Sequence, residues 1–146
     1  CGCGGGWAGD CGPETGLVER AIDGDTLELS GGERVRYLLV DAPEIHGRFA
    51  ECFGAEALRY NSDLVAGRTV QLSYDRTCRD RFDRLLAYVA VDGAEVNRLL
   101  VERGYACFRE SSTEDNEHEA RYAAAQARAK AEGRGMWAAC EENPCR

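Results

Sequence analysis

One short stretch, residues 36–44, does the most to limit what this chain can fold into. An apolar run, Tyr-Leu-Leu-Val, stands at its centre between charged residues, which predicts a buried strand. Pro43 has no backbone N–H to donate and disfavours a helical conformation in the residue before it, so the strand must end there. Asp41 and Glu44 are therefore expected on a stiff turn at the end of a strand. An ordinary charged turn would have the same sequence.

Short strands separated by turn signals continue on both sides of this stretch. We predict strands at residues 17–22, 26–29, 70–74 and 85–91, in addition to the one that ends at Asp41. Asp-Gly-Asp at residues 23–25 predicts a hairpin between the first two strands. Helices are expected at residues 54–66, in a short segment from Val96 to Gly104, and at residues 117–132. The inward face of the first helix is expected to carry Ala55, Leu58, Ser62 and Val65.

Five short strands with helices late in the chain predict an α+β fold. The small five-stranded barrel of the oligonucleotide-binding (OB) type, with about three helices packed around it, is the obvious candidate. A generic α+β sandwich is the alternative. The chain has 146 residues and is expected to form one domain. We place that domain at residues 16–138, between a Gly- and Cys-rich tail at residues 1–15 and a Cys-containing tail at residues 139–146.

Charge and hydropathy argue against two classes of protein. The formal net charge of −8 argues against nucleic-acid binding through a broad basic face, although a local cluster of cations is still compatible with it. The cations are 17 arginines and a single lysine, so nearly every positive site is a planar fork suited to phosphate or carboxylate. No apolar run approaches the ~18 residues that a transmembrane helix needs.

Eight cysteines are too many for a typical cytosolic protein of this size and predict disulfides in an oxidising compartment. Their spacing does not match the paired C-x2-C pattern of common zinc sites. The sequence starts at Cys1, which suggests that a leader has been removed and that the protein is exported: secreted, periplasmic or at the cell surface. A lipid anchor on Cys1, as in a bacterial lipoprotein, is a minority hypothesis. We expect a monomer.

Carboxylates and arginines stand where paired strands would bring them together. Asp25 opens a strand and Asp41 closes the next one, so the two carboxylates are expected side by side, where they must share a proton or bind a cation. Their hard oxygen donors favour Ca²⁺ or Mg²⁺ over zinc. Arg36 and Arg84 could stabilise charge on a phosphoryl group, and Glu44 could activate a water molecule. Surface salt bridges are the alternative role for each arginine.

Four motifs carry a resemblance to a known family. They are Asp-Gly-Asp-Thr at residues 23–26, Arg36 followed by Asp-Ala-Pro-Glu at residues 41–44, Gly-Ala-Glu-Ala at residues 54–57, and Asp-Arg-Phe-Asp-Arg-Leu-Leu-Ala-Tyr at residues 80–88. In this order and spacing they resemble the staphylococcal (micrococcal) nuclease family over roughly residues 16–137. The resemblance implies a Ca²⁺-dependent phosphodiesterase on an OB barrel that cleaves DNA and RNA and leaves 3′-phosphates.

The resemblance also implies roles for individual residues. The Ca²⁺ ligands would be Asp25, Asp41 and the backbone carbonyl of Ala42, with Asp23 behind them. The catalytic residues would be Arg36 and Arg84 on the phosphate and Glu44 as the general base or water-orienting group. Phe82 and Arg81 would contact the substrate. The chain departs from the family at Asp83, where glycine is usual, at Phe82, where tyrosine is usual, and at Glu110 and Ser112, which replace tyrosines of some members.

Disulfide connectivity is not determined by the sequence. Family geometry implies Cys107 with Cys140. Cys52 with Cys78 would join two loops beside the site, and Cys11 would pair with Cys145 or another terminal cysteine. Two other functions compete with the nuclease: a catalytically silent OB barrel that binds nucleic acid or protein, and a disulfide-rich extracellular interaction domain. Neither of them needs the complete set of carboxylates and arginines.

Overall fold

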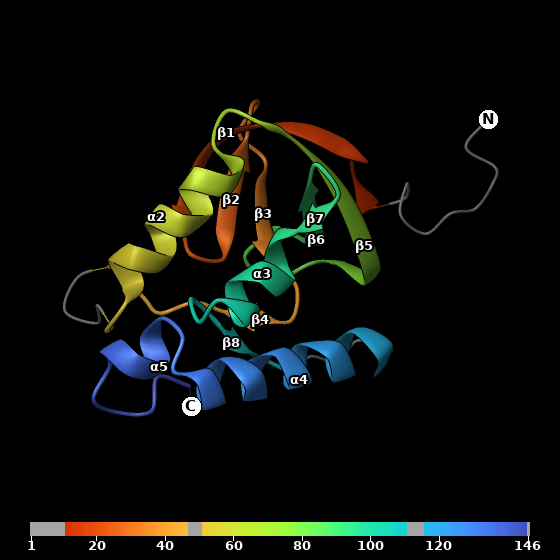
Figure 1. The fold of residues 1–146 in the computed structure, drawn as a ribbon. Helices are drawn as coiled ribbons and strands as arrows, with labels where there is room; N and C mark the ends of the chain where they lie inside the picture. Colours follow the sequence, from red (N-terminus) through yellow and green to blue (C-terminus); the bar gives the residue numbers. More distant parts are fainter. Residues whose placement is uncertain (1–10, 47–50, 111–115, 146) are drawn as a thin grey trace.

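The computed structural model describes residues 11–46, 51–110 and 116–145. Five strands form its core: β1 (Thr15–Asp23), β2 (Thr26–Leu29), β3 (Arg34–Tyr37), β5 (Thr69–Arg79) and β6 (Leu85–Val91). The order is β3-β2-β1-β5-β6 with antiparallel neighbours, and β3 also pairs in parallel with β6. That last pairing closes the sheet into a barrel (Figure 1). The predicted five-stranded OB-type barrel in an α+β fold is therefore confirmed.

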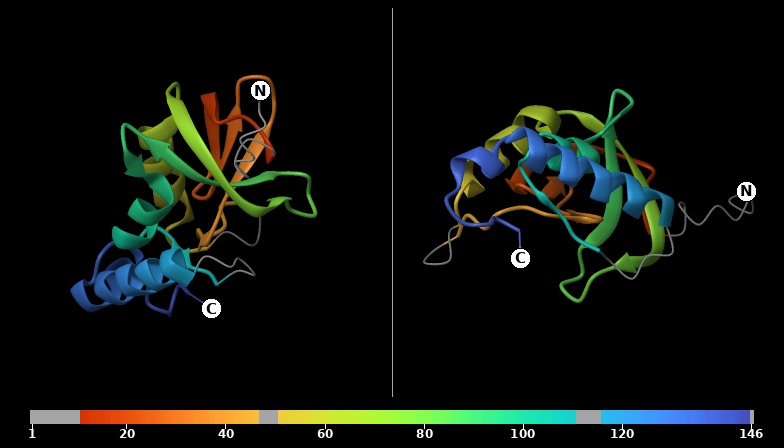
Figure 2. Two further views of the ribbon diagram at one scale, coloured as in Figure 1. Left: turned by 90° about the vertical axis from the view of Figure 1, so that its right-hand side faces the viewer. Right: turned by 60° about the horizontal axis from the view of Figure 1, so that its bottom comes forward.

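Short strands and four described helices surround the barrel. Two-residue strands β4 (Val40–Asp41) and β8 (Cys107–Phe108) pair with each other, and β7 (Ala94–Glu95) pairs with β6. The helices are α2 (Gly54–Val65), α3 (Val96–Glu102), α4 (Asn116–Glu132) and α5 (Met136–Ala139). Helix α3 contacts both β6 and α4, and the views in Figure 2 show α4 on the α3 side of the barrel. None of the helices in the described part is long and apolar enough to cross a membrane.

Alternation along the strands fills the barrel. In β5, Val70, Leu72 and Tyr74 are buried while the residues between them are exposed, because successive side chains of a strand point to opposite faces. Strand β6 is buried along most of its length, since it pairs on both sides and is covered by α3. These two strands therefore supply much of the core on which the edge segments rest.

The strand predicted to run unbroken to Asp41 is wrong. Strand β3 ends at Tyr37, and Leu39 takes a left-handed conformation with φ of 66°, so the chain bends before β4. Arg36 Nη1 donates to the carbonyl oxygens of Tyr37 and Val40, at 2.7 and 2.8 Å, on either side of the bend. These carbonyls lose their place in a ladder and need other donors. Arg36 therefore builds the turn that presents Asp41.

The predicted inward face of the first helix is also wrong in part. Helix α2 buries Gly54, Ala57, Asn61 and Val65, whereas Ala55 is exposed and Leu58 and Ser62 are half-buried. The reason is close packing on the β1–β2 turn, where a Cβ at Gly24 would lie 2.8 Å from the Ala57 side chain. Asn61 is buried because it accepts a hydrogen bond from Tyr37 Oη and donates one to the Asp23 carbonyl. Hydrophobicity alone cannot identify such a face.

All six described cysteines form disulfides, but each predicted pairing is wrong. The bonds are Cys11–Cys78, Cys52–Cys140 and Cys107–Cys145, in place of Cys107–Cys140, Cys52–Cys78 and Cys11 with a terminal cysteine. Helix α5 leads Cys140 to the segment before α2, and the residues after it return to β8. Strand β5 is longer than predicted and carries Cys78 to the start of β1. Cys1 lies outside the described residues.

Asn97 is expected to be critical for stability. It is fully buried on α3; its Oδ1 accepts from Val89 N (2.9 Å), and its Nδ2 donates to the carbonyls of Leu38 (3.0 Å) and Ala87 (3.1 Å). We expect Asn97→Ala to lower the free energy of unfolding by about 2–4 kcal/mol, because several buried backbone groups lose their partners. Urea denaturation of the oxidised protein measures this. The control is the exposed Asn143→Ala, and a loss at Asn97 no larger than the control's would contradict the prediction.

Candidate active site

Two adjoining hollows lie where β4 pairs with β8. The first, the arginine hollow, has a volume of 560 Å³ and is lined in part by Arg36, Asp80, Arg81, Phe82, Arg84 and Arg109. The second, the carboxylate hollow, has a volume of 390 Å³ and is lined in part by Asp41, Ala42, Pro43, Glu51, Arg109 and Glu110. Both lie within the ~300–1,000 Å³ range of small-ligand sites. Arg109 and Glu110 line both hollows, so the two form one continuous depression.

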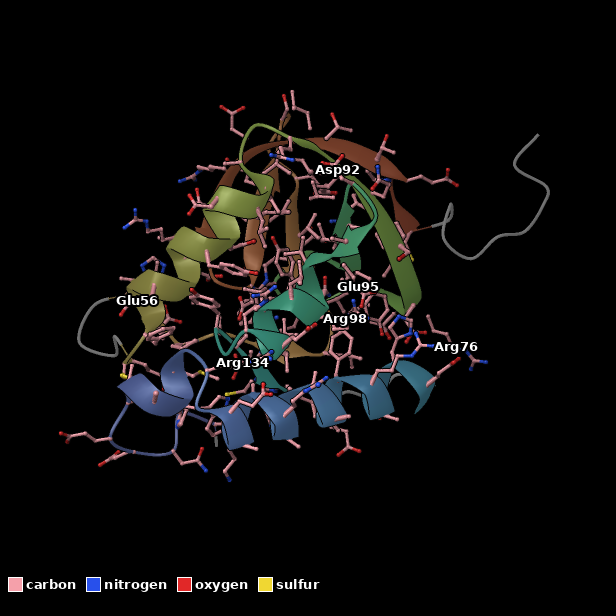
Figure 3. All side chains as sticks on the ribbon, viewed as in Figure 1. Glu56, Arg76, Asp92, Glu95, Arg98 and Arg134 are labelled. Carbon is pink, nitrogen blue, oxygen red and sulfur yellow. A yellow bond between two sulfur atoms is a disulfide. The ribbon has the colours of Figure 1, made fainter. Side chains whose placement is uncertain are left out.

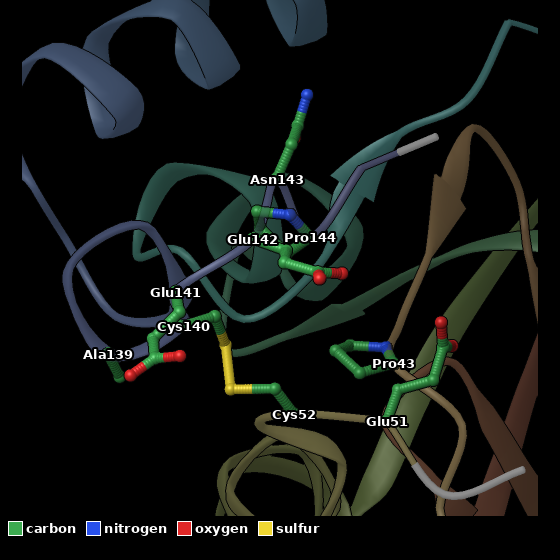
Figure 4. Close-up of a pocket in the computed structure, with 9 residues that line it drawn as sticks. All are labelled: Pro43, Glu51, Cys52, Ala139, Cys140, Glu141, Glu142, Asn143 and Pro144. Atoms are coloured by element: carbon green, nitrogen blue, oxygen red, sulfur yellow. A yellow bond between two sulfur atoms is a disulfide. The ribbon is translucent and has the colours of Figure 1, made fainter.

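A third hollow continues from the carboxylate hollow through Pro43, Glu51 and Pro144. This acidic hollow has a volume of 550 Å³, and its charged lining residues are Glu51, Glu141 and Glu142. Figure 4 shows the Cys52–Cys140 disulfide in its wall. Positive side chains thus line one end of the depression and negative ones the other.

Arg36 joins two of the carboxylates that the sequence analysis singled out. Its Nη2 lies 3.3 Å from Asp25 Oδ2 and 3.5 Å from Asp41 Oδ1. Asp25 is buried at the turn before β2, whereas the side chain of Asp41 is 50% exposed at the end of β4 and borders the carboxylate hollow. The structure therefore brings Asp25, Arg36 and Asp41 together, as their positions on paired strands predict.

The acidic groups here carry more negative charge than the arginine neutralises. Burial, followed by the charge of Asp25, raises the pKa of Asp41, although Arg36 acts in the opposite direction. Burial and the charge of Asp25 likewise raise the pKa of Asp23 to about 7. Asp23 lies behind Asp25, with its Oδ1 accepting the Asp25 N–H at 2.9 Å. A cation would relieve this repulsion.

The oxygen donors here are of the kind that hard cations such as Ca²⁺ prefer. Asp25 and Asp41 offer carboxylate oxygens, and neither imidazole nor thiolate is present beside them. Asp25 Oδ2 also accepts the N–H of Ala42 at 2.8 Å, which ties the turn after β4 to the first carboxylate. Across the residues that the structure describes, no three His, Cys, Asp or Glu side chains gather closely enough to hold a metal ion. Water and substrate oxygens would have to complete the coordination.

Arg84 is held in place by Asp80, a residue that the sequence analysis did not assign to the site. Asp80 Oδ2 lies 2.8 Å from Arg84 Nε and 2.7 Å from its Nη2. Partial burial acts to raise the pKa of Asp80, but hydrogen bonds from Arg84 and from the N–H of Phe82 outweigh it, and the net pKa is lowered. Asp83 completes this turn with φ of 63°, a conformation for which glycine is usual. The carboxylate thus orients Arg84 towards the hollow it lines.

Phe82 is the exposed aromatic residue of this turn. Its side chain is 64% exposed, and the guanidinium carbons of Arg81 and Arg84 lie 4.8 and 5.3 Å from its ring centroid. Because this large apolar ring is exposed to solvent and contacts two guanidinium groups, it is available to stack on a planar ligand.

Glu44 is next to Pro43 in the chain, but it lines none of the three hollows. Its Oε1 accepts the N–H groups of Ile45 (2.9 Å) and His46 (3.1 Å). Glu51 clamps its backbone: Glu51 Oε1 accepts the Glu44 N–H at 2.9 Å, and Glu51 N donates to the Glu44 carbonyl at 2.7 Å. A Cβ at Gly54 would lie 2.6 Å from that carbonyl oxygen, so only glycine fits there. The structure therefore holds Glu44 firmly on its loop.

Three residues of the site escaped the sequence analysis: Asp80, Glu51 and Arg109. Arg109 Nη1 lies 3.8 Å from Asp41 Oδ2, because β8 pairs with β4. A two-residue strand has no hydrophobic pattern long enough to be recognised, so its neighbour could not be placed. Glu110 borders both hollows, whereas Ser112 lies outside the described residues.

Several known proteins have sequences similar to that of this chain. The sequence model of the family of staphylococcal nuclease homologues matches residues 34–139 of this chain. Endonuclease YncB of Bacillus subtilis is 42% identical over 95 residues, which cover 61% of this chain and 45% of YncB. The succinoglycan biosynthesis protein ExoI of Rhizobium meliloti is 35% identical over 146 residues, 93% of this chain and 72% of that protein. An uncharacterised endonuclease of Escherichia coli O157:H7 is 32% identical over 142 residues, 94% and 86% of the two chains. The chain thus spans less than half the length of YncB.

Proposed function

The chain belongs to the family of staphylococcal nuclease homologues, and on that premise we propose that it is a Ca²⁺-dependent nuclease. It hydrolyses phosphodiester bonds of DNA or RNA by attack of water at phosphorus and leaves 3′-phosphate ends. The observation that supports this most is the position of Arg36, which contacts Asp25 and Asp41 and lines the hollow that also holds Arg84. A binding module would not need carboxylates and arginines at one point.

In this proposal Asp25, Asp41 and the carbonyl of Ala42 hold the ion. When bound there, the ion would supply Lewis-acid polarisation of the phosphate. Asp23 supports this arrangement through its hydrogen bond to the Asp25 N–H. Arg36 keeps the two carboxylates in register, because one guanidinium contacts both of them.

The arginines bind the phosphate and stabilise the charge that develops on its oxygens. Asp80 occupies the Nε–Nη2 edge of Arg84, so the guanidinium is oriented before substrate arrives and Nη1 lies outside that pair. Phe82 stacks on a base, a contact worth ~1–3 kcal/mol per base. Arg81, whose guanidinium carbon lies over the Phe82 ring at 4.8 Å from its centroid, contacts the substrate beside it. Glu44 orients or deprotonates the attacking water.

Digestion of single-stranded DNA tests the proposal. With Ca²⁺ we expect cleavage that stops when a chelator is added and returns when Ca²⁺ is restored in excess, because the carboxylates alone leave the phosphate unpolarised. Mass spectrometry of the products should find phosphate on their 3′ ends. Cleavage that persists in the chelator would contradict the metal role. Binding of DNA without cleavage in Ca²⁺ would favour the silent barrel instead.

Three disulfides suit an oxidising compartment, and we propose that the protein is exported and acts as a monomer. The mass of the native N-terminus tests whether Cys1 carries a lipid. Light scattering of the purified protein tests the oligomeric state.

A further inference from the structure

We propose that Arg109 binds a backbone phosphate of the substrate strand, next to the scissile phosphate and on the side of the carboxylate hollow. The inference rests on the proposed nuclease function and adds a phosphate-binding residue to it. It starts from Arg109, the one basic side chain in the described part of the chain that lines both the arginine hollow and the carboxylate hollow.

The backbone of Arg109 is fixed beside the site. Strand β8 pairs with β4 through Val40 opposite Phe108 and Asp41 opposite Cys107, and Arg109 N donates to the Leu39 carbonyl at 2.8 Å. The Cys107–Cys145 disulfide anchors the same strand. The side chain itself is 69% exposed. Arg109 therefore presents an exposed guanidinium from a fixed backbone position.

Arg36 and Arg84, the two arginines assigned to the scissile phosphate, are committed to protein acceptors, and Arg81 lines only the arginine hollow. Arg36 Nη1 donates to two carbonyls and its Nη2 faces two carboxylates, while Arg84 is paired with Asp80 along one edge. Arg109 has a single, long contact with Asp41, at 3.8 Å in solvent. Such an exposed ion pair contributes ~0–1 kcal/mol to stability, so Arg109 can leave Asp41 for a substrate phosphate at little cost. Arg109 is thus the guanidinium that a second phosphate on the side of the carboxylate hollow can reach, since Arg36, Arg81 and Arg84 do not line that hollow.

Charge along the depression makes this contact necessary. A nucleic-acid strand that leaves the arginine hollow meets Asp41, Glu51 and Glu110. Beyond them it meets the acidic hollow, with Glu141 and Glu142. Its phosphates would be repelled there. Among the residues that the structure describes, Arg109 is the single cation lining the carboxylate hollow, and its planar fork matches two phosphate oxygens.

Salt dependence of binding separates this role from a structural one. The probe is a fluorescein-labelled oligothymidylate with chelator present, titrated by anisotropy over a range of NaCl concentrations. We expect the slope of log K against log[NaCl] to become shallower by about 0.7 in Arg109→Ala, the value for one lost phosphate contact on a single strand. Arg109→Lys should keep the wild-type slope, because the charge remains. In cleavage assays the alanine variant should raise KM more than it lowers kcat.

The matched control is Arg128→Ala on α4. Arg128 is 73% exposed and has an equally long pair, 3.8 Å to Glu132, but lines none of the three hollows, so its slope should equal that of the wild type. An unchanged slope in Arg109→Ala, or no measurable binding by the wild type, would overturn the inference. If the wild type binds with the expected slopes but does not cleave DNA in Ca²⁺, the nuclease proposal fails while the role of Arg109 in binding stands.

Discussion

Replacing Arg84 by alanine should lower kcat for cleavage of single-stranded DNA by roughly 10²–10³-fold or more, the usual cost of removing a preorganised donor to transition-state charge. Asp80 orients this guanidinium through two contacts, of 2.7 and 2.8 Å, before substrate binds. The alanine variant loses the donor and also leaves Asp80 as an uncompensated negative charge in the arginine hollow. Steady-state rates with saturating Ca²⁺ measure the effect.

Arg68→Ala is the matched control for Arg84. Arg68 is also an arginine beside a strand and pairs with an aspartate, Asp92, at 3.1 Å. That pair is exposed and lies at the far end of the barrel from β4 and β8, as the position of Asp92 in Figure 3 shows. The cleavage rate of Arg68→Ala should stay close to that of the wild type. Near-normal activity of Arg84→Ala would refute the assignment of Arg84, whatever the control does.

Replacing Glu44 by alanine should lower kcat by ~10²–10⁴-fold, the typical contribution of a positioned general base. Two roles are combined in this side chain. Its carboxylate is the candidate base, and the same carboxylate accepts the N–H groups of Ile45 and His46 and so holds its own loop. The alanine variant removes both roles together.

Glu44→Gln separates the two roles. The amide oxygen of glutamine can still accept the two loop N–H groups, but the side chain has no basicity. If Glu44 acts on water, the glutamine variant should be nearly as slow as the alanine variant while its free energy of unfolding stays close to that of the wild type. Glutamine activity near that of the wild type would mean that Glu44 serves only to hold the loop.

Patterns of sufficient length could be read from the sequence. Strand β6 occupies the predicted residues 85–91 and β2 the predicted residues 26–29, because their apolar runs are bounded by clear turn signals. Helix α4 begins within one residue of its predicted start and ends at the predicted Glu132. The proximity of Asp25 to Asp41 follows from the order of these strands.

Features that depend on one unusual backbone angle or on tertiary contacts could not be predicted from the sequence. Leu39 has the side chain of a strand residue, and nothing local announces that it takes a positive φ; the bend is imposed by Arg36 and Asn97, which bond to the carbonyls around it. Disulfide partners likewise depend on where α5 ends in space. Arg109 was missed for a similar reason, since its importance comes from the pairing of two strands of two residues each.

The Cys52–Cys140 bond has a consequence for survival among proteases. The two cysteines are 88 positions apart in the sequence, so the bond closes a covalent loop that runs from before α2 to the end of α5. A single backbone cut anywhere inside that loop leaves both fragments attached, so they do not diffuse apart and can remain docked. A nicked molecule would therefore migrate as one species in a denaturing gel until a reductant is added, and then as two.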